Sequence, residues 1–533
     1  MTQHPGLQER KAVWQSLGLQ RGWTLHQAMQ QALADRPDAI AAFHAPGTDI
    51  DVCTLADLHV QAKRLAAGLV RAGLGRDDVI AVQLPNAREI AVFAIAAARL
   101  GCVLLPIVHI FGPKELGYIL KDSGARALVV STQWKKGLAA ERLSELETLP
   151  DRIIVVGPVI EGVETLSYNE LLQDQGGVPM PENVDPETVA LLLYTSGTTA
   201  APKGVRHTHT SLLAEFFAQA VNHGDTRSAW LCPWPSGHIA GTMGLLSHSL
   251  LGRDSVIMQQ WDAVAAAHLI SDYKVEQTSG TPLHLTGILE AAREHRLDLS
   301  SLKRFITGAT TVPETIVARA EAAGVKACRA YGSTELPTST QCSEFDPLEK
   351  RLTTDGRPRP GCEVRIVDES LNDVPTGQEG EILVRGAELA QGYTNAERTA
   401  EAFLDEGWFR TGDIGRLDED GFMTVTDRKK DIIIRGGENI SSLEVEDLIL
   451  QIPSVREVAA VAAPDERLGE VVCAFVVLQP DASIDIPAIS AHFQARGVAR
   501  QKTPERLELV DALPRNPTGK VLKTELRDRL RQA

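Results

Sequence analysis

Residues 194–205 bring hydroxyl side chains, glycine and lysine together in one short segment. The segment follows the apolar run 189–193 and reads Tyr194-Thr195-Ser196-Gly197-Thr198-Thr199-Ala200-Ala201-Pro202-Lys203-Gly204-Val205. Glycine lets the backbone approach a ligand closely, hydroxyl and backbone N–H groups donate hydrogen bonds, and lysine offsets negative charge. This chemistry suits a polyphosphate, although a flexible surface turn explains the segment alone equally well. It is not a Walker P-loop, because no Gly-Lys-Ser/Thr follows Gly197 at the required spacing.

Five further polar motifs follow this segment in a fixed order. They are Tyr331-Gly332-Ser333-Thr334-Glu335, Trp408-Phe409-Arg410-Thr411-Gly412-Asp413, Asp427-Arg428-Lys429-Lys430-Asp431, Gly436-Gly437-Glu438-Asn439 and Pro514-Arg515-Asn516-Pro517-Thr518-Gly519-Lys520. Each has an ordinary structural explanation on its own: a core tyrosine, a solvated glutamate, a turn aspartate, a connector or an exposed terminal lysine. Their combination is specific, because chance assembly of all of them in this order is negligible.

In this combination the sequence resembles the adenylate-forming superfamily of acyl-CoA synthetases, luciferases and peptide-synthetase adenylation domains. The resemblance covers nearly the whole chain. It is strongest to bacterial short- and medium-chain fatty acyl-CoA synthetases and to cyclohexanecarboxylate–CoA ligases, in the passages 106–112 and 428–442. One departure is Ala200, where the family usually carries glycine. If that position needs a positive φ, alanine costs roughly 1 kcal/mol and weakens ATP binding.

The resemblance implies a two-step acid–thiol ligase that uses ATP, Mg²⁺ and coenzyme A. A carboxylate attacks the α-phosphorus of Mg-ATP, which gives an acyl-adenylate and pyrophosphate, and the thiol of coenzyme A then displaces AMP. The first step brings two anions together, so positive charge and hydrogen-bond donors must stand at the meeting point. The second step needs a water-free channel for the thiol.

The same resemblance implies roles for the groups that meet ATP. Glu335 is expected to be the Mg²⁺ ligand, since a hard cation suits one carboxylate together with phosphates. Thr334 is expected to donate to the α-phosphate. Asp413 would accept hydrogen bonds from both ribose hydroxyls, with Arg428 on the same ribose. The residues expected to hold the β- and γ-phosphates or the adenine are Thr195, Ser196, Gly197, Thr198, Thr199, Lys203, Gly308, Ala309, Tyr331 and Gly332.

A second group of residues is expected beside the carboxylic acid. The segment Gly308-Ala309-Thr310 matches the one that lines the adenine and the acyl carboxylate. His238 matches an aromatic or histidine position at the acyl pocket, where it could gate the acid or be a satisfied core histidine. Trp234 and Met243 could line the acyl tunnel or serve only in packing.

The C-terminal motifs imply a domain that moves between the two steps. Lys520 matches the catalytic lysine that bridges the acyl carboxylate and the α-phosphate. Lys430 matches the hinge about which the domain rotates. Gly436, Gly437 and Glu438 match the turn that lines the channel for coenzyme A. One lysine cannot reach the α-phosphate while this turn occupies the same entrance, so rotation is expected.

The elements that position these motifs are predicted from the sequence pattern. Ala-rich helical patterns alternate with β-branched runs, such as 79–82, 127–130 and 153–156, which is typical of helix-covered parallel sheets. Gly-punctuated strands at 363–367 and 381–384 predict a β-rich subdomain at about 360–427. We therefore expect an α/β fold with a large N-terminal domain, 1–427, and a small mobile α+β C-terminal domain, 428–533.

Within the C-terminal domain the pattern predicts a strand at 431–434, a helix at 443–452 and a strand at 471–478. Ser441 with Glu444 three positions later fits a capping box, so a helix is expected to begin just after the turn 436–439. This places a tight glycine turn between a strand and a helix.

Composition limits the possible functions and locations. The 533 residues carry 54 basic and 70 acidic side chains, and the resulting charge of −16 excludes nucleic-acid binding driven by bulk charge. The 7 cysteines form no Cys-x-x-Cys pair, which favours a reducing compartment without a zinc site or disulfide framework. The most apolar stretch, 90–108, is interrupted by Arg99 and Pro106, and no segment offers the ~20 apolar residues of a membrane span. The N-terminus lacks the apolar core of a signal peptide, so we expect a cytoplasmic protein without an integral membrane segment. No oligomeric state is indicated.

Two alternatives stay open at this point. The protein could be a stand-alone adenylating enzyme that loads an acyl group onto a separate carrier protein, because no carrier domain follows Lys520. It could also be a non-catalytic sensor of nucleotides or acyl groups. The presence of all three motif residues, Glu335, Asp413 and Lys520, argues against a non-catalytic sensor.

Overall fold

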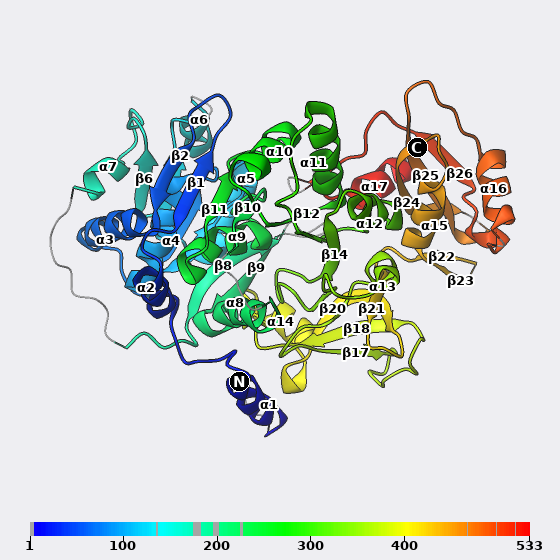
Figure 1. The fold of residues 1–533 in the computed structure, drawn as a ribbon, viewed down its shortest axis with the longest axis horizontal. Coiled ribbons are helices and arrows are strands. Elements are labelled where there is room, and N and C mark those ends of the chain that lie inside the picture. Colours follow the sequence, from blue (N-terminus) through cyan, green and yellow to red (C-terminus); the bar gives the residue numbers. More distant parts are fainter. Residues whose placement is uncertain are drawn as a thin grey trace.

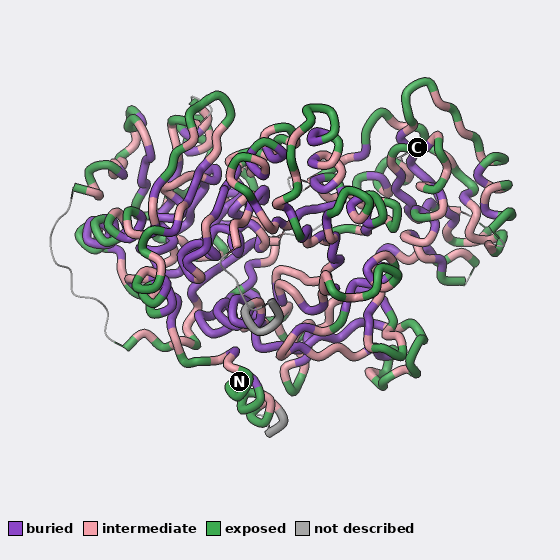
Figure 2. Tube along the Cα trace, in the orientation of Figure 1, coloured by how far each residue is buried: buried purple, intermediate pink, exposed green. Residues whose placement is uncertain are grey.

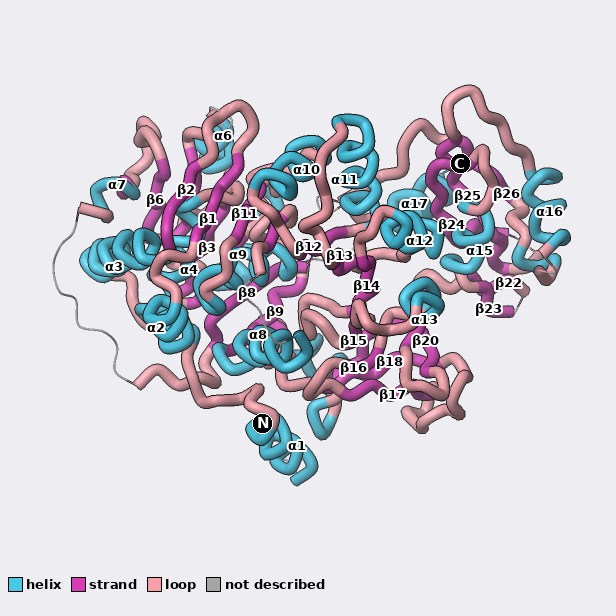
Figure 3. Tube along the Cα trace, in the orientation of Figure 1, coloured by secondary structure: helices cyan, strands magenta, loops and turns pink. Residues whose placement is uncertain are grey.

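The computed structural model describes residues 5–134, 137–173, 183–195, 202–223, 228–436, 438–465, 467–496, 498–516 and 519–532. The fold is mixed α/β: two large sheets and a smaller one form the N-terminal region, and a fourth sheet belongs to the C-terminal region. The C-terminal region, orange to red in Figure 1, lies at one end of the molecule. Helices surround the strands of the large sheets (Figure 3).

The first large sheet carries the predicted alternation of strands and helices. Its strands lie in the order β19 (Gly392–Tyr393), β9 (Lys203–Thr208), β8 (Val189–Thr195), β4 (Val103–Pro106), β3 (Val79–Gln83), β5 (Ala127–Ser131), β6 (Arg152–Val156) and β7 (Leu166–Ser167). The strands from β8 to β7 run parallel, while β9 and β19 are antiparallel to their neighbours. Parallel strands are covered on both faces, which explains their continuous apolar runs.

The second large sheet places several strand ends toward the centre of the molecule. Its order is β16 (Arg357–Pro358), β15 (Thr340–Gln341), β14 (Lys326–Tyr331), β13 (Arg304–Thr307), β12 (Gln277–Gly280), β10 (Trp230–Cys232), β11 (Ser255–Met258), β1 (Ile40–His44) and β2 (Asp51–Thr54). Because β12, β13 and β14 are parallel, their carboxyl ends meet at one edge.

Helices fill the space around these two sheets. They are α1 (Pro5–Ser16), α2 (Leu25–Asp35), α3 (Leu55–Arg71), α4 (Arg88–Leu100), α5 (Pro113–Ser123), α6 (Leu138–Ser144), α7 (Tyr168–Leu171), α8 (His209–His223), α9 (Ile239–Leu251), α10 (Ala263–Asp272), α11 (Pro282–His295), α12 (Glu314–Ala322), α13 (Leu348–Thr353) and α14 (Ala396–Ala402), with a 3₁₀ helix at Asp405–Gly407. The main core joins both sheets with α3, α4, α8 and α9, and it includes Phe93, Phe216 and Ile257. Buried chain is concentrated in the strands and in the helices between the sheets (Figure 2).

A smaller antiparallel sheet follows in the chain. Its order is β17 (Glu363–Val367), β18 (Gly380–Arg385), β20 (Phe409–Leu417) and β21 (Met423–Arg428), drawn in yellow in Figure 1. The predicted strands 363–367 and 381–384 thus occur as β17 and β18. The facing positions of β20 and β21 bring Asp413 opposite Arg428.

The C-terminal sheet has the order β23 (Glu438–Ile440), β22 (Ile433–Arg435), β25 (Gly469–Leu478) and β24 (Val455–Asp465), with β26 (Arg506–Leu509) paired to β25. It is accompanied by α15 (Ser442–Leu450), α16 (Ile486–Ala495), α17 (Lys523–Gln532) and a 3₁₀ helix at Arg500–Lys502. Separate apolar clusters are built on Val472 with Phe493 and on Cys473 with Leu526, so the sheet is packed on both faces.

Most predicted C-terminal elements are present, but the surroundings of the glycine turn differ from the prediction. β22 and β23 pair as a hairpin in which Arg435 faces Glu438, and only then does α15 begin. Gly436 has φ +58°, a conformation that favours glycine. Ser441 caps the helix, because its side chain accepts a hydrogen bond from the Glu444 N–H. The reciprocal bond of the predicted capping box is not formed among the described residues, since the Glu444 carboxylate accepts from Lys502 Nζ instead.

The connection between β21 and the C-terminal region is tied by hydrogen bonds across residues 429–431. Ser441 Oγ donates to the Thr426 carbonyl over 2.7 Å, and the Ser442 N–H donates to Asp427 Oδ2 over 2.5 Å. Along the chain, Lys430 lies between the end of β21 and these two serines.

The seven cysteines are free and buried. In the described ranges no helix combines the length and apolar character of a membrane span.

Candidate active site

A cavity of about 820 Å³ collects residues from both large sheets, the small sheet and the C-terminal region. Its walls include the carboxyl ends of β12, β13 and β14, at Gly280, Gly308 and Tyr331, and the facing ends of β8 and β9. Thr195 and Lys203 pair across β8 and β9 and both line the cavity. Open α/β sheets bind ligands at such carboxyl ends, where loops leave the strands.

One corner of the cavity is built around Asp413. The Tyr331 hydroxyl donates to Asp413 Oδ2 over 2.6 Å, and Arg428 Nε lies 3.3 Å from Oδ1. Burial, and then the Asp413 carboxylate, raise the pKa of Tyr331 well above its usual value, so the hydroxyl remains a donor. The sequence did not indicate this bond, because the two residues are 82 positions apart.

Two glycines allow the backbone of this corner to pack closely. A Cβ on Gly308 would lie 2.3 Å from the Ala330 carbonyl oxygen, and one on Gly332 would lie 2.0 Å from that of Pro337. Both positions line the cavity, so the flat backbone forms part of its wall. Ala309 has φ +65° and also lines it, whereas Thr310 is exposed and is not among the lining residues. The predicted place of Thr310 in the acyl pocket therefore differs from the structure, in which Thr310 does not line the cavity.

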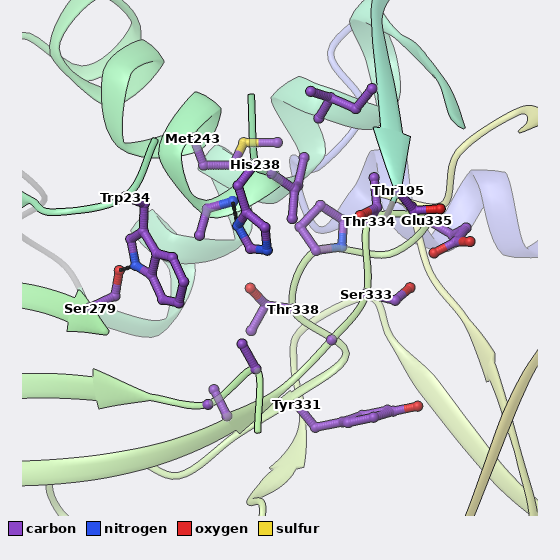
Figure 4. A pocket seen from close by; sticks show the side chains of 18 of the residues that line it. Thr195, Trp234, His238, Met243, Ser279, Tyr331, Ser333, Thr334, Glu335 and Thr338 are labelled. Atoms are coloured by element: carbon purple, nitrogen blue, oxygen red, sulfur yellow. Dashed lines mark hydrogen bonds between the residues drawn. The ribbon is translucent and has the colours of Figure 1, made fainter. Parts of the chain in front are cut away.

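Thr334 and Glu335 are presented by a tight turn after β14. The turn is closed by the Ser333 N–H, which donates to the Leu336 carbonyl over 2.9 Å. A hydrogen bond fixes the backbone of Thr334, because Nε2 of the fully buried His207 donates to the Thr334 carbonyl over 2.7 Å. Glu335 is 8% exposed, and the Tyr393 hydroxyl donates to its Oε1 over 2.6 Å. Figure 4 shows Ser333, Thr334 and Glu335 along one side of the cavity, with Thr195 beside them.

Glu335 is a single carboxylate rather than part of a metal cluster. In the described part of the chain no group of three or more His, Cys, Asp or Glu residues could hold a metal ion. Mg²⁺ commonly binds one or two carboxylates and completes its coordination with phosphate oxygens and water. The residues present therefore fit Mg²⁺ that enters with a nucleotide.

A mostly apolar and aromatic wall extends the cavity away from Asp413. Trp234 and His238 stack with ring centroids 5.0 Å apart and an interplanar angle of 11°. Trp234 Nε1 also donates to Ser279 Oγ over 3.0 Å, which holds the indole in place. Met243 lies on the same wall (Figure 4).

His238 caps α9 and is neutral at physiological pH. Burial, and then the charge of Lys520, lower its pKa to about 4. Its Nδ1 accepts a hydrogen bond from the Ala240 N–H over 3.2 Å, so the proton of the neutral ring stands on Nε2. The ring can therefore donate one hydrogen bond to an acid in the cavity.

The C-terminal region contributes Lys520 to the cavity, together with Asn516. The Lys520 N–H donates to Asn516 Oδ1 over 2.8 Å, and the Asn516 N–H donates back to the Lys520 carbonyl over 2.8 Å. Burial lowers the pKa of Lys520 to about 7, with Arg428 and Lys430 acting in the same direction and Asp413 opposing them. Lys430 also lines the cavity.

The structure brings most of the predicted residues together, but not those of the thiol channel. Gly436 and Glu438 are exposed and do not line the cavity, and Glu438 accepts a hydrogen bond from Gln501 over 3.0 Å. Ser196, Gly197, Thr198, Thr199 and Gly437 lie outside the described residues. Sequence reasoning missed Tyr393, Ser279 and Asn516. Only Asn516 had a signal, because it belongs to the motif that ends at Lys520.

Sequence profiles of two related regions match the chain. The profile described as AMP-binding enzyme matches residues 29–394, and the profile described as AMP-binding enzyme C-terminal domain matches residues 444–520. The medium-chain fatty-acid–CoA ligase of Escherichia coli (strain K12) is 33% identical over 527 residues, covering 98% of this chain and 93% of the relative. The fatty acid–[acyl-carrier-protein] ligase ScoC of Streptomyces coeruleorubidus is 32% identical, covering 95% of this chain and 98% of the relative.

Solved structures agree with these matches. The o-succinylbenzoate coenzyme A synthetase of Bacillus subtilis in complex with ATP and magnesium ion has a TM-score of 0.80 at 27% identity, covering 95% of this chain and 99% of that one. The same synthetase with its acyl-adenylate intermediate has a TM-score of 0.82 at 27% identity, covering 94% and 98%. The chain belongs to the AMP-binding enzyme family and is an ATP-dependent, adenylate-forming ligase.

Proposed function

We propose that the protein activates a short- or medium-chain fatty acid, or an alicyclic acid, with ATP and transfers the acyl group to coenzyme A in the cytoplasm. The observation that carries this proposal is the position of Lys520, which lines the same cavity as Asp413 and Glu335 although it belongs to the C-terminal region. The Lys520 side chain thus shares one cavity with a polar corner suited to a nucleotide and an apolar wall suited to an acid.

In the first half-reaction a carboxylate oxygen of the acid attacks the α-phosphorus of ATP, and pyrophosphate leaves. Both reactants are anions, so the Lys520 ammonium group lowers their repulsion at the meeting point. His238 donates from Nε2 to the second carboxylate oxygen and orients the acid. The Thr334 hydroxyl donates to the α-phosphate.

The nucleotide is held by residues from three sheets. Tyr331 lies against the adenine, and Asp413 accepts hydrogen bonds from the ribose hydroxyls with Arg428 beside it. Thr195 and Lys203 stand at the start and the end of the loop that holds the β- and γ-phosphates. Glu335 would hold Mg²⁺, and the bound cation would neutralise charge on these phosphates.

In the second half-reaction the thiol sulfur attacks the acyl carbon, and AMP leaves. We propose that the C-terminal region rotates about Lys430 before this step. Rotation would withdraw Lys520 and bring the turn at 436–438 to the cavity, where it would line the thiol channel. The exposed position of Gly436 and Glu438 supports an assignment of the present arrangement to the first half-reaction.

The walls of the cavity support an acid of limited length. Its volume of about 820 Å³ must hold both the nucleotide and the acyl group. Trp234 is clamped by His238 and Ser279, so this wall cannot move aside easily for a long chain. Flat or folded apolar groups of medium size suit such a wall.

The acceptor is the point on which the relatives differ, since they include both coenzyme A ligases and a carrier-protein ligase. The test supplies purified protein with Mg-ATP, one acid from a panel of butyrate, octanoate, palmitate and cyclohexanecarboxylate, and either coenzyme A or a pantetheine-loaded carrier protein. AMP release and the mass of the thioester are measured.

We expect acyl-CoA with octanoate or cyclohexanecarboxylate as the preferred acid, and no AMP release from the Lys520→Ala variant. Palmitate as the best substrate would refute the proposed acid class. Thioester on the carrier protein but none on coenzyme A would refute the proposed acceptor.

A further inference from the structure

Tyr393 links two groups on the phosphate side of the cavity that are far apart in the sequence. It lies at the end of β19, is 3% exposed and lines the cavity. Its hydroxyl donates to Glu335 Oε1 over 2.6 Å. Within the described residues, Glu335 Oε2 accepts no hydrogen bond, so one carboxylate oxygen is occupied and the other is left for a ligand.

The ring of Tyr393 contacts the lysine that ends the phosphate loop. Lys203 Nζ lies 4.9 Å from the ring centroid, in the position of a cation–π contact. The ring itself is held in place by Phe403, whose centroid is 5.4 Å away at an interplanar angle of 82°. The backbone is fixed as well, because the Tyr393 N–H donates to Thr399 Oγ1 over 2.9 Å.

The backbone on either side of Tyr393 makes the same two connections. The Ala390 N–H donates to the Glu335 carbonyl over 2.8 Å. The Thr394 N–H donates to the Gly204 carbonyl over 2.8 Å, next to Lys203. The segment 390–394 therefore ties the turn that carries Glu335 to the strand that carries Lys203.

We propose that Tyr393 is a positioning residue for the adenylation step, which orients the Glu335 carboxylate toward Mg²⁺ with its hydroxyl and supports Lys203 with its ring. This inference rests on the proposed role of Glu335 in holding Mg²⁺. Groups that hydrogen-bond a metal-binding carboxylate fix its direction, and their removal typically weakens metal affinity 10–100-fold.

The test replaces the two parts of the side chain separately. Tyr393→Phe removes the hydroxyl and keeps the ring beside Lys203. Tyr393→Leu removes both. Tyr168→Phe is the matched control, since Tyr168 is equally buried and its hydroxyl has no hydrogen-bond partner in the described structure. Thermal unfolding of each variant checks that it is folded.

The primary measurement is binding, by calorimetric titration of Mn²⁺ in the presence of ATP and of ATP in the absence of metal. For Tyr393→Phe we expect Mn²⁺ to bind about 10–100-fold more weakly, with metal-free ATP binding changed less than about 3-fold. Tyr393→Leu should weaken metal-free ATP binding as well, because Lys203 loses its support. Thioester formation from supplied acyl-adenylate should stay at the wild-type rate in Tyr393→Phe.

A parallel titration of Glu335→Gln separates this inference from the proposed function. If Glu335→Gln weakens Mn²⁺ binding and Tyr393→Phe does not, Tyr393 does not orient the carboxylate and the inference is overturned. If neither variant changes Mn²⁺ binding, the assignment of Glu335 to the metal is wrong. A loss in Tyr168→Phe equal to that in Tyr393→Phe would also overturn the inference.

Discussion

The lowered pKa of Lys520 leads to a specific pH dependence of adenylation. In the free enzyme, burial and the cations Arg428 and Lys430 bring this pKa to about 7. The reaction needs the charged ammonium group, which exists below the pKa and is lost above it. We therefore expect kcat/KM for adenylation to fall with rising pH on a descending limb that starts near pH 7, because kcat/KM reports ionisation of the free enzyme.

The size of the effect follows from the titration of a single group. Above the pKa the protonated fraction falls about tenfold per pH unit, so about a tenth remains one unit above it and about a hundredth two units above it. The descending limb of the kcat profile should lie at higher pH than that of kcat/KM, because the bound ATP and acid are anions that favour the charged form of Lys520. His238 is not the source of this limb, since its pKa of about 4 keeps it neutral throughout the range.

The assay is ATP–pyrophosphate exchange at subsaturating acid, between about pH 6 and pH 9. Lys520→Arg carries a guanidinium that does not deprotonate in this range, so its kcat/KM should be lower but flat. Lys303→Ala, at an exposed ion pair with Glu276, is the control and should keep the wild-type profile. A descending limb in Lys520→Arg at the wild-type pH would refute the reasoning, because another group would then titrate.

Three further results are expected. Glu335→Gln should raise the Mg²⁺ concentration needed for half-maximal pyrophosphate exchange at least about tenfold; an unchanged Mg²⁺ dependence would contradict its role. Lys430→Pro should leave adenylation within about tenfold but slow single-turnover thioester formation far more, because proline fixes φ at the pivot; wild-type thioester formation would place the pivot elsewhere. His207 is fully buried with its pKa lowered by burial to about 4, so the unfolded chain binds the extra proton first as pH falls. The neutral, buried His207 makes its full contribution to the free energy of unfolding above pH 6.5. From pH 6.5 toward pH 4 this contribution should fall by up to about 3 kcal/mol, so the free energy of unfolding should fall less in His207→Gln than in the wild type. Urea unfolding at several pH values measures the difference.

Local elements could be predicted because their signals are local. The β-branched runs at 127–130 and 153–156 became β5 and β6, and the Ser441 cap marked the start of α15. These features depend on side chains within a few positions of one another. The hairpin was missed because its second strand, β23, has only three residues, which are too few to show a strand pattern.

The motif residues could be identified from the sequence by resemblance, and most of them share one cavity. Their partners could not be identified in this way. Tyr393 meets Glu335 across 58 positions, and Tyr331 meets Asp413 across 82, with no spacing rule that connects them. Whether a predicted residue reaches the cavity was equally undecided, since Ala309 lines the cavity and the next residue, Thr310, does not.

The family, the reaction class and the residue types available for catalysis could be identified from the order and chemistry of the motifs. Which of those residues contact one another, and in what charge state, depends on the folded arrangement of the chain. Lys520 is an ordinary lysine in the sequence, and its pKa of about 7 arises from burial beside Arg428 and Lys430. Burial and nearby charge depend on segments that are far apart in the sequence and come together only in the folded protein.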